Sequence, residues 1–336
     1  MTLLLALAWA SLAVGQVATP TLMPWEGGAT GNAATLVYAP SGFAGGLYGS
    51  GTTETYDNSA TKIGSGDIQT RQLHARLVGQ RFAASLDAHV NKLSSEQTPG
   101  AVFSFHTRDT FQRAGLAVRI FDDFSIGVGA EHNKQQSDNL VGTPPLGGGT
   151  FHVSERREAT LPLVGVVLRF GSVVYLGTTI GQEQLHLEQT GIQPSPDFVT
   201  FDPKRDVLRY GLGLMWLGKD GAVRIEAAAE TRDAYFQPGL FGGPDTPSKD
   251  KREAARGAVD LRWGAVMLSA TTRRDNVFDD GNKAQTQDET SVGLGWVPQS
   301  GWAVTIANLR TRIDFSSIVI GHHEFDMNAL ALHRQF

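Results

Sequence analysis

Alternation of apolar and polar side chains with a period of two constrains the fold of this chain more than any other feature of its sequence. In residues 208–216, Leu, Tyr, Leu, Leu and Trp occupy the even positions, and Arg, Gly, Gly and Met occupy the odd positions. The same pattern recurs in 82–90, 116–120, 124–131, 259–263 and 292–296. Successive side chains of a strand point to opposite faces, so each stretch is predicted to be a strand with one apolar face.

The stretch 223–232, V-R-I-E-A-A-A-E-T-R, sets this periodicity against local preference. Its Ala, Glu and Arg residues are good helix formers, whereas Val223 and Ile225 alternate with Arg224 and Glu226 as they would in a strand. Strand preference depends more on context than helix preference does. Because alternating stretches flank it on both sides, we predict that residues 223–232 form a strand.

The connections between the predicted strands alternate in length along the whole chain. Six short turns are predicted at residues 79–80, 122–123, 171–172, 219–221, 263–264 and 298–301. Seven longer polar loops are predicted near residues 57–67, 93–107, 135–152, 189–203, 236–250, 277–287 and 314–321. This order implies fourteen strands running up and down, an even number that is typical of single-chain bacterial outer-membrane barrels.

The apolar face of such strands has two alternative surroundings. In a soluble sandwich it points inward, whereas in a membrane barrel it points at lipid, with short turns on the periplasmic side, long loops outside and aromatic residues at the interfaces. Eight aromatic residues lie within about three residues of a predicted short turn, as in such a girdle: Phe82, Phe121, Phe124, Phe170, Trp216, Trp263, Trp296 and Trp302. This clustering favours an all-β, antiparallel, up-and-down transmembrane barrel of about 14 strands.

The other face of the strands would then line the interior of the barrel. It carries the following ionisable residues among many glycines: Arg76, Asp87, His89, Arg119, Glu131, Arg169, Arg209, Arg224, Glu226, Glu230, Arg232, Asp260, Arg262 and Arg273. A charge on the lipid face costs about 2–4 kcal/mol near the bilayer midplane, so these residues are expected to face the lumen. They would pair with one another across strands or, in part, line a permeation path.

Composition and local motifs exclude several other classes. A net charge of -5 with no Lys/Arg cluster gives no footprint for nucleic acid, and the absence of Cys excludes disulfides and thiolate sites. We interpret His322, His323 and Glu324 as solvated loop residues rather than metal ligands, and the G-x-G triplets at 127–129, 211–213 and 293–295 as small lumen-facing positions. His106 and His152 lie near Ser104, Asp109 and Ser154 without an activating motif. We therefore predict neither an enzyme nor a cofactor or metal site.

Both ends of the chain carry features of an exported protein. Residues 1–15 form an apolar run that ends in small residues, although no Lys or Arg precedes it, and we expect them to be a signal peptide. The chain ends A-L-A-L-H-R-Q-F, with Leu330, Leu332 and the terminal Phe336 spaced as in the C-terminal strand of outer-membrane barrel proteins, and with Arg334 where an apolar residue is usual. This resemblance implies recognition of Phe336 by the barrel-assembly machinery.

Residues 31–45, G-N-A-A-T-L-V-Y-A-P-S-G-F-A-G, resemble a segment of the FadL family of long-chain fatty-acid transporters. Five residues match that segment in kind, and Ala39 and Ser41 depart from it; the matching residues are Val37, Tyr38, Pro40, Gly42 and Phe43. The resemblance implies fourteen strands, an N-terminal plug inside the barrel, here residues 16–42, and a barrel of residues 43–336. It also implies that hydrophobic compounds leave through the wall, where Pro162 would kink a strand.

These observations together predict a barrel of the bacterial outer membrane, in contact with outer-membrane lipid and lipopolysaccharide. Its predicted function is passive uptake of a small hydrophobic or amphipathic solute. A polar-solute porin would fit the Arg-rich interior, and a structural or adhesive barrel acting through its extracellular loops is the third alternative.

Overall fold

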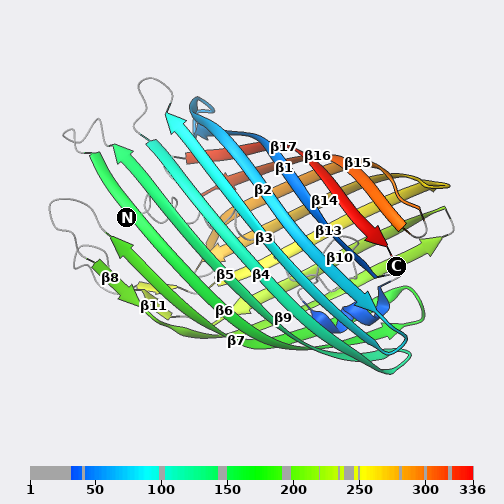
Figure 1. The fold of residues 1–336 in the computed structure, drawn as a ribbon. Coiled ribbons are helices and arrows are strands. Elements are labelled where there is room, and N and C mark those ends of the chain that lie inside the picture. Colours follow the sequence, from blue (N-terminus) through cyan, green and yellow to red (C-terminus); the bar gives the residue numbers. More distant parts are fainter. Residues whose placement is uncertain are drawn as a thin grey trace.

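The computed structural model forms one closed, tilted barrel of long strands (Figure 1). It describes residues 32–39, 42–97, 103–142, 150–190, 198–218, 220–233, 235–237, 246–248, 250–279, 282–298, 301–316 and 320–335. The predicted signal peptide, residues 16–31 of the predicted plug, and Phe336 lie outside these ranges. Within the described residues, none of the helical structure is long and apolar enough to cross a membrane.

Fourteen long antiparallel strands build the wall, and the predicted strand number is confirmed. They are β1 (Phe43–Asp57), β2 (Lys62–Val78), β3 (Phe82–Gln97), β4 (Phe103–Phe121), β5 (Phe124–Gly142), β6 (Thr150–Phe170), β7 (Val174–Thr190), β9 (Lys204–Gly218), β10 (Gly221–Arg232), β13 (Asp250–Trp263), β14 (Val266–Asp279), β15 (Asn282–Trp296), β16 (Gly301–Phe315) and β17 (Ile320–Gln335). Three short strands accompany them: β8 (Phe198–Phe201) on β7, and β11 (Tyr235–Gln237) paired with β12 (Thr246–Ser248). A 3-10 helix, η1 (Ala33–Tyr38), precedes the wall.

Neighbouring strands pair in chain order, and β1 closes the barrel by pairing with both β2 and β17. Closure leaves no long open edge, which is the condition for a sheet to span a bilayer. The ambiguous stretch 223–232 lies in β10, where Ala227 is opposite Leu212 of β9, so its prediction as a strand is confirmed.

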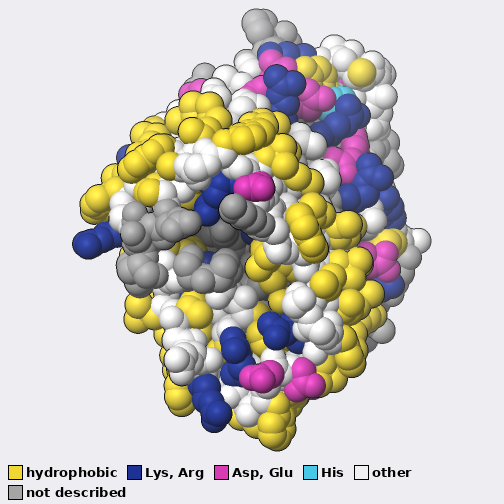
Figure 2. Space-filling model, turned by 90° about the vertical axis from the view of Figure 1, so that its right-hand side faces the viewer, with side chains coloured by type: hydrophobic (Ala, Val, Ile, Leu, Met, Phe, Trp, Pro, Cys, Tyr) yellow, Lys and Arg dark blue, Asp and Glu magenta, His cyan; other side chains and the backbone are white. Residues whose placement is uncertain are grey.

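The two faces of the wall differ as a membrane barrel requires. On β9 the side chain of Leu212 is 48% exposed, whereas that of Arg209 is 2% exposed. Most of the predicted girdle also points outward beside the short turns: Phe82, Phe121, Phe170, Trp216, Trp263, Trp296 and Trp302 are exposed. Figure 2, which faces the short-turn end, shows hydrophobic side chains over the rim and charged side chains gathered on another part of the surface. An apolar outside and a polar inside exclude the soluble sandwich.

Four predicted long loops are wrong in extent, because strands occupy most of residues 57–67, 93–107, 135–152 and 277–287. Residues 57–67 contain only a four-residue connection at 58–61, and residues 277–287 contain only the connection at 280–281. The strands are 12 to 21 residues long, whereas about 9–11 residues cross a bilayer. Their loop-side halves carry polar side chains on both faces, so the alternation that identifies a half-buried strand is missing there.

Candidate functional site

The interior wall holds the candidate residues, and the structure places all fourteen on its side of the strands. Ten of the side chains are buried: Arg76, Asp87, His89, Glu131, Arg209, Arg224, Glu226, Glu230, Asp260 and Arg273. The other four are half-buried: Arg119, Arg169, Arg232 and Arg262. Because the neighbouring outward residues are apolar, these buried charges must be compensated inside the barrel.

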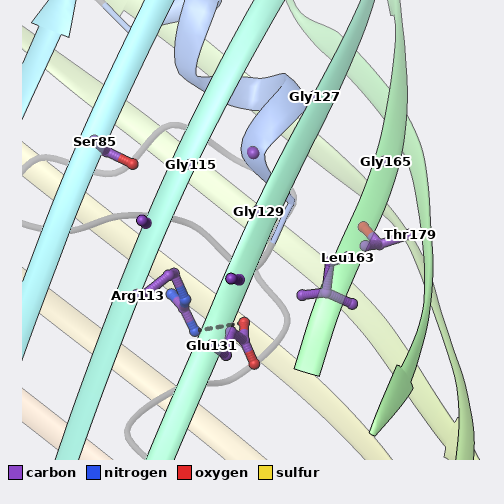
Figure 3. A pocket seen from close by; sticks show the side chains of 12 residues that line it. Ser85, Arg113, Gly115, Gly127, Gly129, Glu131, Leu163, Gly165 and Thr179 are labelled. Carbon is purple, nitrogen blue, oxygen red and sulfur yellow. Dashed lines mark ion pairs between the residues drawn. The ribbon is translucent and has the colours of Figure 1, made fainter. Parts of the chain in front are cut away.

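A bidentate ion pair of the interior joins strands that are not neighbours. The guanidinium of Arg209 on β9 donates two hydrogen bonds, both of 2.8 Å, to the two carboxylate oxygens of Glu131 on β5. Because β6 and β7 separate β5 from β9 in the wall, this pair runs across the inside of the barrel. Arg113 on β4 lies 3.0 Å from the same carboxylate. Figure 3 shows this second pair on the inner face of the wall.

The ion pairs continue from Arg209 along the same side of the interior. Its Nε donates to Glu230 at 2.5 Å, Arg232 lies 2.9 Å from Glu230, and Arg232 also contacts Glu183 at 3.0 Å. Arg205 donates to Glu183 through its Nε at 2.7 Å. We define Arg113, Glu131, Glu183, Arg205, Arg209, Glu230 and Arg232 as the transverse network. The sequence prediction missed Arg113, Glu183 and Arg205, although period two from Arg209 would have placed Arg205 on the same face.

Two smaller polar groups occupy other parts of the wall. The first lies on β10, β13 and β14: Arg224 pairs with Asp260 on the adjacent strand, and Arg252 lies 3.1 Å from Asp275, which also accepts hydrogen bonds from Arg273. The second group lies on β2–β4: Asp87 accepts a 2.8 Å hydrogen bond from Gln72, and the ring of His89 stacks on Phe111 at 4.9 Å between centroids. Neither group spans non-adjacent strands as the Arg209–Glu131 pair does.

The described residues 32–39 of the predicted plug lie against the inner wall near the short turns. η1 contacts β3, β4, β5 and β6, and glycines on the inner face of the wall make room for it. A Cβ at Gly127 would collide with the backbone of Ala34, and one at Gly165 would collide with the side chain of Asn32 (Figure 3). The triplet at 127–129 therefore serves close packing against an internal segment.

Polar contacts fix the start of η1 in this groove. The amide of Asn32 donates to the carbonyl oxygens of Val166 at 3.1 Å and Thr178 at 3.3 Å, while its own oxygen caps the helix by accepting from the N–H of Ala34 at 3.0 Å. Ser125 donates to the carbonyl oxygen of Ala34 at 2.7 Å. These four hydrogen bonds satisfy polar groups in a buried place, which favours a single docked position.

Two arginines hold the end of η1. The guanidinium of Arg119 donates to the carbonyl oxygen of Val37, and its carbon lies 5.3 Å from the ring centroid of Tyr38. The guanidinium carbon of Arg169 lies 5.0 Å from the same centroid. Tyr38 also packs edge to face on Tyr175, with 5.7 Å between centroids. Both predicted arginines thus contact the internal segment rather than a carboxylate.

Docking of η1 is expected to depend on Gly127. The change Gly127→Ala places a methyl group into the backbone of Ala34, so hydrogen exchange of the amides of residues 33–38 should rise about tenfold or more. Gly129→Ala is the control on the same strand face, because its Cβ would be 3.8 Å from Ala33 of the segment and its closest contact, the carbonyl oxygen of Ala114 at 3.1 Å, belongs to the wall. Exchange is read by mass spectrometry of the purified barrel. Equal exchange rates in the two variants would show that the glycine groove does not hold the segment.

The hydrogen-bond ladder of the wall is interrupted between β6 and β7. Thr160 pairs with Gln184 and Leu163 with Gly181, and the pairing skips Leu161 and Pro162. On its other side β6 remains paired, since Pro162 is opposite Ala130 of β5. Pro has no N–H to donate, which explains why the ladder lapses on one side only.

An apolar patch backs this interruption on the inside. Leu161, Leu163 and Val207 form a cluster of buried side chains. Glu183 of the transverse network lies on the part of β7 that does not pair with β6, although β7 stays paired with β9 there. The interruption therefore has apolar side chains and one end of the transverse network behind it.

The structure corrects the interpretation of His322, His323 and Glu324, and it places His106 and Asp109 on opposite faces of the wall. His322, His323 and Glu324 lie within β17, and His323 is buried and shares a 2.8 Å hydrogen bond with Thr55, so it is not a solvated loop residue. His106 is exposed on the outer face of β4 while Asp109 is buried on the inner face, so they cannot act together. The described residues contain no group of three metal-ligating side chains.

No model of a known protein family matches this sequence, and no curated protein matches it. Solved structures do match the fold. A Pseudomonas aeruginosa FadL homologue superposes with a TM-score of 0.59 at 12% identity over 98% of this chain and 97% of that chain. The Pseudomonas putida toluene transporter TodX gives 0.61 at 12% over 94% and 95%, and the Ralstonia pickettii toluene transporter TbuX gives 0.58 at 10% over 96% and 98%. The chain has the barrel fold of these FadL-type transporters, which confirms the resemblance at the level of the fold.

Proposed function

We propose that this protein is a barrel of the bacterial outer membrane that passes small hydrophobic or amphipathic compounds inward without an energy source. The observation that carries the proposal is the interrupted ladder at Pro162 with Leu161, Leu163 and Val207 behind it. An apolar solute needs a path that avoids buried charges, because apolar groups cannot compensate them. The interruption combines a break in the wall with apolar side chains on its inner side.

The charges of the interior argue against free passage of polar solutes along the axis. The Arg209–Glu131 pair runs across the inside, and η1 occupies the inner wall near the short turns. A solute on that route would have to break bidentate, desolvated ion pairs. In this proposal the segment 16–42 acts as the plug, and the transverse network separates the apolar path from the rest of the lumen.

The fold likeness supports the same solute class. TodX and TbuX are toluene transporters, and this chain shares their barrel fold although few residues are identical. By the same proposal the long loops face outside, the outer wall contacts outer-membrane lipid, and Phe336 is read by the barrel-assembly machinery. A polar-solute porin is the second candidate, favoured by the many charges of the interior.

Uptake measurements distinguish these functions. Gram-negative cells that express the protein should take up radiolabelled toluene or oleate several-fold faster than cells carrying an empty vector, about two- to tenfold if the barrel is the main route. Vesicles containing the purified protein should swell no faster in arabinose than protein-free vesicles. Fast swelling without hydrophobic uptake would establish the polar-solute porin. Absence of both activities would favour the structural or adhesive barrel.

The role of the wall interruption can be tested at Pro162 itself. Pro162→Val restores an N–H that can pair with β7, so the break should close and hydrophobic uptake should fall about threefold or more. Val164→Ala, on the same exposed face of β6, is the control and should leave uptake unchanged. Uptake is compared at equal amounts of folded barrel in the membrane. Undiminished uptake by the Pro162→Val variant would exclude the interruption as the route.

A further inference from the structure

Four basic side chains lie next to one another on the outside of β2–β5. Lys92 on β3 is directly opposite Arg108 on β4. Arg71 is opposite Val90, two residues from Lys92, and Lys134 is opposite Thr110, two residues from Arg108. Opposite and diagonal neighbours on one sheet face are within reach of long side chains, at about 5–8 Å. We call Arg71, Lys92, Arg108 and Lys134 the basic row.

The basic row is on the outer surface, not in the lumen. Arg71, Lys92 and Arg108 are exposed and Lys134 is half-buried, whereas the alternate residues Asn91, Asp109 and Gln135 are buried inside. Arg71 also lies over the ring of the exposed Tyr48, with its guanidinium carbon 5.9 Å from the ring centroid. A Tyr–Arg pair of this kind is typical of a membrane interface.

The row borders the apolar part of the wall on its loop side. Toward the short turns, the same face of the four strands carries exposed apolar residues, among them Leu73, Leu86, Leu116 and Val128. Toward the long loops, the outward residues are polar, as with Gln69 and Gln136. Long loops lie outside the cell in such barrels, so the row is at the level of the outer-leaflet headgroups.

Several other basic side chains of the outer wall lie beside a carboxylate. Lys62 contacts Glu54, Arg156 contacts Glu158 and Glu188, Arg274 contacts Asp288, and Arg310 contacts Asp326. Among the described residues, no ion pair within 4.0 Å involves a member of the basic row. Like charges directly opposite each other, as Lys92 and Arg108 are, destabilise a sheet unless an anion lies between them.

Three carboxylates are opposite or diagonal neighbours of the row, but among the described residues none of them lies within 4.0 Å of a row cation. Asp67 is opposite Ser94, two residues beyond Lys92, and Asp138 is opposite His106, two residues beyond Arg108. Glu158 is opposite Lys134, but its carboxylate lies 3.9 Å from His132 and 3.8 Å from Arg156. The positive charge of the basic row is therefore available to ligands outside the barrel.

We propose that the basic row binds the phosphate groups of lipopolysaccharide, with the lipid A acyl chains lying along Leu73, Leu86 and Leu116. This inference depends on the outer-membrane placement and not on the transported solute. Arg and Lys bind phosphate through strong charge-assisted hydrogen bonds, and lipid A carries two phosphates on one rigid disaccharide, which suits several cations a few ångströms apart. A basic residue near an anionic lipid surface is attracted to it, and the attraction weakens as salt rises.

The test uses the purified full-length barrel in detergent with bisphosphorylated lipid A as the probe. Native mass spectrometry should show wild-type barrel binding this lipid about tenfold or more tightly than fully dephosphorylated lipid A, with affinity falling as salt rises. Lys92→Gln combined with Arg108→Gln should weaken binding by a similar factor. The control, Arg310→Gln combined with Arg312→Gln, removes two exposed cations from β16 that have carboxylate partners and should change binding less than about twofold.

Each remaining outcome decides against the proposal. Equal binding of dephosphorylated lipid A would show that phosphate is not recognised, a comparison that needs no variant. Equal loss in the two double variants would show a general effect of surface charge. If phosphatidylglycerol binds as tightly as lipid A, or if millimolar inorganic phosphate displaces lipid A, the basic row binds anions in general and is not specific for lipopolysaccharide. Heat-dependent gel mobility confirms that each variant is folded.

Discussion

Leu212→Arg is expected to prevent stable insertion of the barrel into a bilayer. Leu212 lies in the middle of the outward apolar positions 208–216 of β9, and its side chain faces the surroundings. An Arg on the lipid face near the midplane costs about 2–4 kcal/mol, a large share of the stability of a typical domain. Folding into lipid vesicles, followed by heat-dependent gel mobility, should show a loss of most folded barrel.

The control for Leu212→Arg is Gly213→Ser, which adds a polar group to the next residue on the inner face. This variant should insert normally, because the interior tolerates polar side chains. Normal insertion of Leu212→Arg with failure of Gly213→Ser would reverse the assignment of the two faces.

Arg209→Ala is expected to lower the free energy of unfolding by about 3–5 kcal/mol, because removal of one partner leaves buried charges uncompensated. Arg209 is 2% exposed and holds both Glu131 and Glu230. Urea titration of the barrel in lipid vesicles, followed by tryptophan fluorescence, measures the change. A double change to Leu at Arg209 and Glu131 should recover part of the loss, since it removes both charges together.

Arg274→Ala provides a control with the same chemistry and different burial. Arg274 makes two hydrogen bonds to Asp288, of 2.6 and 2.7 Å, but its side chain is 63% exposed on the outer wall. Exposed pairs contribute about 0–1 kcal/mol, so this variant should unfold almost as the wild type does. Similar losses in the Arg209 and Arg274 variants would contradict a desolvated transverse network.

Period two predicted the strands and their apolar and polar faces, and the alternation of short and long connections predicted their number. The prediction held even where helix preference opposed it, in β10, because the residues facing lipid must all be apolar. It failed beyond the bilayer, at the loop-side ends of β2, β3, β4, β5, β14 and β15, where both faces meet water and alternation is no longer selected. Loop lengths were therefore overestimated.

The partners inside the barrel could not be predicted, because they depend on which strands lie across the lumen. The sequence predicted pairing across strands without naming partners, and the structure joins Arg209 to Glu131, 78 residues away and on a strand that is not its neighbour. Likewise, G-x-G at 127–129 indicated small lumen-facing positions but not that η1 would occupy the space. The basic row also needed strand register, since Lys92 and Arg108 are opposite each other only once β3 and β4 are aligned.

The central claim is that the apolar face of the wall contacts lipid and the polar face lines the lumen. Spin labels can test this orientation directly. The chain has no Cys, so single cysteines can be introduced at Leu208 and Leu214, which face outward, and at Val207 and Met215, which are buried inside. In lipid vesicles, labels at Leu208 and Leu214 should collide mainly with oxygen dissolved in the bilayer, and labels at Val207 and Met215 should be shielded from it. Oxygen access at Val207 and Met215, with water-soluble nickel chelate reaching Leu208 and Leu214, would contradict the account.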